Sequence, residues 1–237
     1  MKTVFLTITK GLVILLIPFW LMIGSVRLLA TSEYLGIEYN KADFPEDSFG
    51  FNQEQRFSFA SENLRYLREN LPVSVLENQN NNGKPLYDDR ELSHMLDVQV
   101  VFQLFWTVWK VISVFFGAIV VLTLFHKGNW KSFASALKIG GFITASFIAT
   151  IGFLAIVGWD TWFLWFHKMF FAAGSWTFNY SDTLIRLFPQ KFWMDAVFTV
   201  SGLSLAGGLL IGFAGRHWQR QGLYLLQFQQ SKQKSAS

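Results

Sequence analysis

The chain has 237 residues, of which 51% are hydrophobic and 18% are aromatic, and its formal net charge is +4. It contains no cysteine, which excludes disulfide bonds, thiolate nucleophiles and thiolate metal sites. The positive charge is small and lies mostly beside apolar segments, so nucleic-acid binding is not needed to explain it.

Four apolar segments are each long enough to cross the hydrocarbon core of a bilayer as a helix. A backbone inside the bilayer has to satisfy its own hydrogen bonds, which favours helices over isolated strands. The sequence therefore predicts an all-α membrane protein with four transmembrane helices, at residues 1–30, 98–125, 133–158 and 195–216.

The first apolar segment has an alternative interpretation as a cleaved signal peptide, because its start is basic and Ala30 lies near a possible cleavage point. Its apolar stretch is long, however, and Arg27 interrupts the region where small residues should precede the cut. We therefore expect this segment to remain as a membrane helix.

Residues 31–97 are too polar to cross a membrane, and we expect them to form a small extracytoplasmic α/β cap. The middle of this region is predicted to be an amphipathic helix, with Asn52 as its N-cap and Asn70 at its end. The side chains expected on its buried face recur every three or four residues: Phe57, Ala60, Leu64 and Leu67.

Three shorter pieces of the cap are predicted from composition. The stretches SEYLGIEY and PVSVL are each expected to be short and extended. The Asn-rich stretch ENQNNNGKP is expected to be a loop.

The stretch DDRELSHMLD begins a helix that runs into the second span. Asp88 or Asp89 can cap this helix, and Glu91 lies in the first turn, where the helix dipole favours a negative charge. His94 and Asp97 are three residues apart, so they share one face of the helix.

Residues 159–194 form an aromatic-rich extracytoplasmic or interfacial segment with thirteen aromatic side chains. An aromatic belt at the level of the lipid headgroups is one interpretation, but it does not explain His167 within the segment. The stretch TLIRLF is predicted to be a short helix capped by Ser181 or Asp182. Asp182 and Arg186 are four residues apart and are expected to form an ion pair.

Lysine and arginine residues indicate the orientation in the membrane. They lie at the start of the first span, between the second and third, and at or just after the end of the fourth: Lys2, Lys10, Lys127, Lys131, Arg216 and Arg220. The positive-inside rule therefore places both termini, including a tail at residues 217–237, in the cytoplasm. The cap and the aromatic-rich segment are then outside.

The four histidines fall into two pairs. His126 and His217 lie at cytoplasmic helix ends, where a cation complements the helix C-terminus, and we interpret both as structural. His94 and His167 are both outward and near the membrane surface. Two such imidazoles can hold a metal, act as acid and base, or cap helices. A third outward histidine is missing, so a metal site is not expected.

Two blocks of the sequence carry a resemblance to a known family. RELSHMLDV before an apolar helix, and FHKMFFAAGSWTFNYSDTLIRLFPQKFW after a third helix, resemble the two signature blocks of the lipoprotein intramolecular transacylase family. The resemblance covers the four-span layout and most of the chain. It implies a multi-pass protein of the bacterial cytoplasmic membrane with its cap outside, and catalysis by His94 and His167 as acid and base.

The resemblance also implies a reaction. An acyl chain moves from the sn-2 ester of a diacylglyceryl-cysteine to the α-amine of the same cysteine, so the partners are a diacylated lipoprotein N-terminus and membrane lipid. No cofactor and no metal are expected. Asp97 is expected to orient an imidazole, and three further residues are expected to shape the site: Trp176, Asp182 and Arg186.

Two other functions stay open on the residues alone. The first is a membrane scaffold or assembly protein that binds a partner through its cap and aromatic surface. The second is a different acyl- or headgroup-modifying enzyme that uses the same two histidines.

Overall fold

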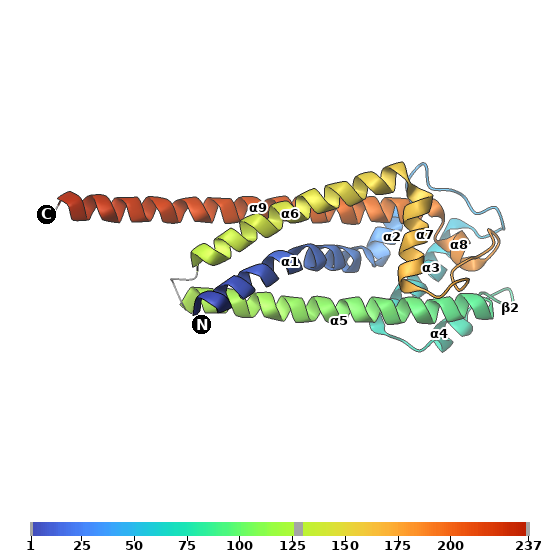
Figure 1. Cartoon of the computed structure of the whole chain (residues 1–237). Helices are drawn as coiled ribbons and strands as arrows, with labels where there is room; N and C mark the ends of the chain where they lie inside the picture. The colour runs from blue at the N-terminus through green and yellow to red at the C-terminus, as the bar shows by residue number, and fades with distance from the viewer. Residues whose placement is uncertain (1, 126–129, 236–237) are drawn as a thin grey trace. The chain divides into compact units, whose positions relative to one another are not determined.

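The computed structural model describes residues 2–125 and 130–235, and most of them are helical (Figure 1). Within these residues four helices are long and apolar enough to cross a membrane, which confirms the predicted four transmembrane helices. They are α1 (Lys2–Leu29), α5 (Asp89–Phe125), α6 (Trp130–Val157) and α9 (Gln190–Ser235). His126, predicted to lie at a helix end, is outside the described residues.

Two of these helices extend beyond the apolar stretch that predicted them. Helix α5 begins at Asp89, before the apolar run that starts at residue 98, which confirms the prediction that DDRELSHMLD begins this helix. Helix α9 begins at Gln190 and continues to Ser235, through the residues predicted as a tail. Glutamine, lysine and arginine, which are frequent there, are good helix formers.

The chain forms two compact units, and each of the four long helices contributes to both. One unit comprises Met1–Gly24, Trp109–Ile151 and Ser201–Ser237. The other comprises Ser25–Val108 and Gly152–Val200. The second unit contains all the residues predicted to form the functional site.

The first unit is held together by close packing of apolar helices. A side chain at Gly141 of α6 would overlap the backbone of α9 at Gly208 and Gly212, so only glycine fits at this crossing. Small residues at such positions let helices in a membrane approach closely, which gains van der Waals contact. On α1, Trp20 stacks on Trp109 of α5 with their ring centroids 5.9 Å apart.

The second unit contains the shorter elements and is mostly helical. Its helices, besides parts of the long ones, are α2 (Ser32–Tyr39), α3 (Gln53–Glu69), α4 (Ser74–Glu77), α7 (Trp159–Phe170) and α8 (Thr183–Leu187). Strands β1 (Asn80–Asn81) and β2 (Lys84–Pro85) form an antiparallel pair. In the described residues this hairpin is the only sheet, so the predicted α/β character of the cap is confined to it.

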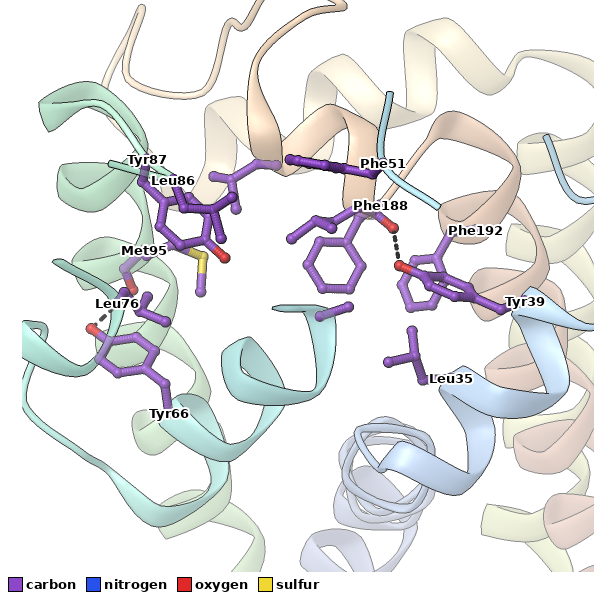
Figure 2. Close-up of a cluster of buried hydrophobic side chains, with 13 residues drawn as sticks. Leu35, Tyr39, Phe51, Tyr66, Leu76, Leu86, Tyr87, Met95, Phe188 and Phe192 are labelled. Carbon is purple, nitrogen blue, oxygen red and sulfur yellow. Dashed lines mark hydrogen bonds between the residues drawn. The ribbon is translucent and has the colours of Figure 1, made fainter. Parts of the chain in front are cut away.

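A cluster of buried apolar side chains joins α2, α3, α4 and α8 to the starts of α5 and α9 (Figure 2). Leu35, Tyr66, Leu76 and Leu187 are fully buried in it. The Tyr39 hydroxyl donates a hydrogen bond of 2.6 Å to the Leu187 carbonyl, which joins α2 to α8. The cluster therefore connects segments far apart in the sequence and gives the second unit its own core.

Three predictions of local structure in the cap are wrong. SEYLGIEY is the helix α2, because the Thr31 hydroxyl accepts a hydrogen bond from the Tyr34 amide and caps its start. PVSVL contains the single helical turn α4 instead of a strand. ENQNNNGKP contains the hairpin, whose turn residues Asn82 and Gly83 both have positive φ. Asn-Gly is a strong hairpin signal because both of its residues tolerate positive φ, whereas composition alone indicates only a loop.

The predicted amphipathic helix is confirmed as α3. Asn52 caps it in a capping box with Gln55, and the left-handed Asn70 ends it. Its most buried face differs from the prediction by about one residue: Arg56, Ala60, Asn63 and Tyr66. Arg56 and Asn63 are polar, so a search for apolar periodicity could not find them. Arg56 can be buried because its guanidinium donates to the carbonyl of Arg186.

The core predicts a difference between two aliphatic side chains of α2. Leu35 is 0% exposed and Ile37 is 62% exposed. We expect Leu35→Ala to lower the free energy of unfolding by about 2–5 kcal/mol, because it leaves a cavity in the cluster. Thermal unfolding of the purified protein in detergent measures this loss. Ile37→Ala is the control and should change the midpoint little; equal shifts would contradict the proposed core.

Candidate functional site

The start of α5 is fixed by Glu91. The Glu91 amide donates to the Asp88 carboxylate (2.8 Å), and the Asp88 amide donates back to the Glu91 carboxylate (3.0 Å). The other Glu91 oxygen accepts a hydrogen bond of 2.8 Å from the Leu184 amide at the start of α8. Asp88 therefore caps α5, which confirms one of the two predicted caps, Asp88 or Asp89. Glu91 is 3% exposed and also connects α5 to α8, which sequence reasoning missed.

His94 lies one turn after Glu91 and is buried, with 9% of its surface exposed. Its imidazole contacts two aromatic rings edge-on, Phe171 at 5.0 Å and Phe178 at 5.3 Å between centroids. Its Nδ1 atom is buried and has no hydrogen-bond partner within the described part of the chain. A buried polar atom without a partner costs free energy and calls for an explanation, such as a role toward a ligand.

His167 lies in the last turn of α7, and its imidazole is surrounded by aromatic rings. The nearest centroids belong to Phe163 at 4.0 Å and Trp176 at 4.8 Å. Its Nδ1 lies 2.8 Å from the Phe163 carbonyl oxygen. Because a carbonyl can only accept, this contact places the proton of the neutral ring on Nδ1 and leaves Nε2 as an acceptor.

Burial lowers the pKa of His167 below its ordinary value, and the hydrogen bond to the Phe163 carbonyl opposes this only in part. Desolvation disfavours the charged imidazolium, so the neutral ring is the favoured form near pH 7. A neutral imidazole with one free nitrogen is a competent proton acceptor.

The structure brings the two histidines together, although they come from different helices. Both imidazoles contact the ring of Phe171, His94 at 5.0 Å and His167 at 5.7 Å, so their separation is at most the sum of these two distances. Figure 1 shows the end of α7 beside α5, where Phe170 also contacts Phe105 of α5.

Trp176, predicted to shape the site, lies beside His167. Its indole Nε1 is buried and has no hydrogen-bond partner among residues 2–125 and 130–235. The indole N–H is a donor only. The site thus combines a donor without a partner, on Trp176, with two imidazoles.

The other supporting residues have partners that the sequence did not predict. Asp182 pairs with Arg90 (2.8 Å) rather than with Arg186. Arg186 pairs with Asp47 (2.9 Å), so the predicted pair within α8 is wrong. Asp97 is exposed and forms no hydrogen bond or ion pair with His94. The prediction that it orients an imidazole therefore has no support in the observed contacts.

Three further residues complete the surroundings of His94. Phe171 and Phe178 contact its ring, and the Arg90 guanidinium lies 5.5 Å from the centroid of Phe178. Their sequence signal was the aromatic density of the 159–194 segment, which does not single out either phenylalanine. Within the described residues no group of three histidine, aspartate or glutamate side chains is arranged to hold a metal ion.

The chain resembles known proteins in sequence and in fold. Residues 11–193 match the family described as lipoprotein intramolecular transacylase Lit. An uncharacterized protein of Aquifex aeolicus (strain VF5) is 30% identical over 208 residues, which cover 86% of this chain and 91% of that protein. The chain belongs to the lipoprotein intramolecular transacylase family. The family predicted from the two signature blocks is therefore confirmed.

Solved structures show the same fold. The lipoprotein intramolecular transacylase Lit of Bacillus cereus superposes with a TM-score of 0.76, at 17% identity, over 93% of this chain and 98% of that one. Two further structures of the Bacillus cereus protein, each with one histidine replaced, give TM-scores of 0.58 and 0.59. The chain is a multi-pass membrane protein of this family, and membership supports a transacylase role.

The environment of His167 predicts an unusual titration. We expect its imidazole to gain a proton at a pH clearly below the ordinary value of about 6.5, because burial disfavours the cation. Nuclear magnetic resonance of the protein labelled at histidine, assigned with His167→Gln, measures the midpoint. Unfolding should return the midpoint to about 6.5; a native midpoint above that value would contradict the described burial.

Proposed function

We propose that the protein moves an acyl chain from the sn-2 ester of a diacylglyceryl-cysteine to the α-amine of the same cysteine, with His94 and His167 as acid and base. The observation that carries the proposal is the convergence of the two imidazoles on Phe171 in a buried, aromatic site. Family membership favours this enzyme over the scaffold alternative.

The amine has to lose a proton before its nitrogen can complete an attack on the ester carbonyl. An α-amino group has a pKa of about 8, so a base is useful near neutral pH. We assign this role to His167, because its Nδ1 proton is held by the Phe163 carbonyl and its Nε2 lone pair remains available. The lowered pKa of His167 supports the same role, since the ring is neutral when the amine arrives.

The attack forms a C–N bond and converts the carbonyl oxygen to an oxyanion. We assign the stabilisation of this oxyanion to the indole N–H of Trp176, because it is a buried donor beside His167 that lacks a partner in the described chain. The collapse of the intermediate then breaks the C–O bond to glycerol. The glycerol oxygen takes up one proton from an imidazolium, so the proton that left the amine is returned and no co-reactant is consumed.

The surrounding aromatic rings suit a reaction within one molecule. The amine and the ester belong to the same substrate, so the main requirement is to hold the substrate in a bend in which they meet. Positioning of this kind lowers barriers by several kcal/mol. The rings around His94 and His167 also reduce the access of water, which would otherwise compete with the amine and hydrolyse the ester.

The proposal includes a location. We place the protein in the bacterial cytoplasmic membrane, with the cap on its outer side and both termini in the cytoplasm. The support is the bias of lysine and arginine toward the predicted cytoplasmic segments.

Replacing either histidine tests the site. We expect His94→Ala and His167→Ala each to lower the transfer rate at least about 100-fold, because each removes a proton-transfer group. The measurement is expression in a host that makes diacylated lipoproteins, followed by mass spectrometry of the N-terminal tryptic lipopeptide with fragment ions that locate the acyl chain. His217→Ala, an exposed histidine, is the matched control. An acyl chain that stays on glycerol with the unaltered protein would refute the reaction, and full activity of both variants would refute the site.

Trp176→Phe tests the oxyanion donor separately. The substitution keeps an aromatic ring but removes the N–H, so we expect kcat to fall about 100-fold with little change in KM. Trp165→Phe is the control, because Trp165 lies on α7 and is 69% exposed. An unchanged kcat for Trp176→Phe would show that another group stabilises the oxyanion.

A further inference from the structure

Two arginines of the second unit meet where α1 and α3 end. Arg27 lies in the last turn of α1 and Arg68 in the last turn of α3. The Arg27 guanidinium donates to the Arg68 carbonyl (3.3 Å), and the Arg68 guanidinium donates to the carbonyls of Arg27 (3.2 Å) and Ala30 (2.8 Å). These bonds satisfy carbonyls at helix ends, but they do not neutralise either charge.

The positive charge of this arginine pair has no ionic partner in the described structure. No carboxylate of the described residues forms an ion pair with Arg27 or Arg68. Glu33 interacts with Arg68 only over a longer distance. The Arg27 Nη1 atom is also buried without a hydrogen-bond partner in that part of the chain. Two like charges held so close repel each other, so an anion bound between them would be stabilised.

The position of the pair indicates the kind of anion. The Arg27 guanidinium lies over the rings of Trp106 (4.5 Å) and Phe102 (5.1 Å) on α5. The apolar span of α1 ends at Leu29, two residues after Arg27. An arginine at the end of a span extends its guanidinium to the depth of the lipid headgroups. The anion available in quantity at this depth is a lipid phosphate.

We propose that Arg27 and Arg68 bind the phosphodiester of a membrane phospholipid. The planar guanidinium offers parallel N–H donors that match two phosphate oxygens, which an ammonium group does not. The bound phosphate neutralises the pair, and the acyl chains of the lipid lie along the apolar surface next to the end of α1. This site is independent of the proposed transacylase reaction, whose substrate ester carries no phosphate.

Native mass spectrometry of the full-length protein in detergent tests the ligand class without any substitution. The probes are phosphatidylglycerol, phosphatidylcholine, diacylglycerol and inorganic phosphate, each added alone. We expect both phospholipids to be retained and to raise the thermal midpoint, phosphatidylglycerol more strongly because of its net charge. Retention of diacylglycerol to the same extent would overturn the proposal. An equal effect of inorganic phosphate alone would assign the site to the free ion and would also overturn it.

Substitutions locate the site. We expect Arg68→Gln and Arg27→Gln each to weaken phosphatidylglycerol binding about tenfold, because each removes a charge-assisted hydrogen bond to phosphate. Arg68→Lys keeps the positive charge but loses the paired N–H donors of the guanidinium. We expect this variant to weaken phosphatidylglycerol binding to an intermediate extent. The control is Arg65→Gln, which removes the same charge from the same helix. Arg65 is exposed and already paired with Glu62 (2.7 Å). Equal affinity of all the variants for phosphatidylglycerol would refute the assignment to this pair. Because only lipid binding is measured, the result does not depend on whether the protein has transacylase activity.

Discussion

The candidate site depends on one buried carboxylate, that of Glu91. One of its oxygens accepts the Asp88 amide within the same turn, and the other accepts the Leu184 amide of a helix almost a hundred residues later in the chain. The Thr183 hydroxyl adds a hydrogen bond to the Leu86 carbonyl at the same place. These contacts fix the first turn of α5 against α8. His94 follows one turn later on the same helix, so the hydrogen bonds of Glu91 also fix the position of its imidazole.

The aromatic surroundings of the candidate site determine the preferred protonation state of His167. Aromatic rings contact both histidines and contribute few polar atoms. They desolvate the His167 imidazole, which lowers its pKa and favours the neutral form that can accept a proton. The same rings leave polar atoms of His94 and Trp176 without partners in the described chain. Such atoms cost free energy in an empty site, and a ligand with matching donors and acceptors can satisfy them.

Hydropathy was sufficient to predict the four spans, because twenty apolar residues in a row have few structural alternatives. Capping rules predicted α3 and the start of α5, since Asn52 and Asp88 act on their own helices. Local rules failed for Arg186, whose nearest acid in sequence is Asp182 but whose actual partner, Asp47, comes from a distant loop. The convergence of His94 and His167 was also inaccessible to such rules and came from the family resemblance. Long-range partners depend on the tertiary fold, which periodicity and capping do not encode.

The glycine contact in the first unit limits where lipid chains can enter between the helices. At Gly141 the backbones of α6 and α9 approach so closely that not even a methyl group fits between them. An acyl chain is wider than a methyl group, so no lipid tail can pass between these two helices at that depth. A hydrocarbon chain therefore cannot diffuse laterally from the bilayer between α6 and α9 at this contact. It has to enter between other helices.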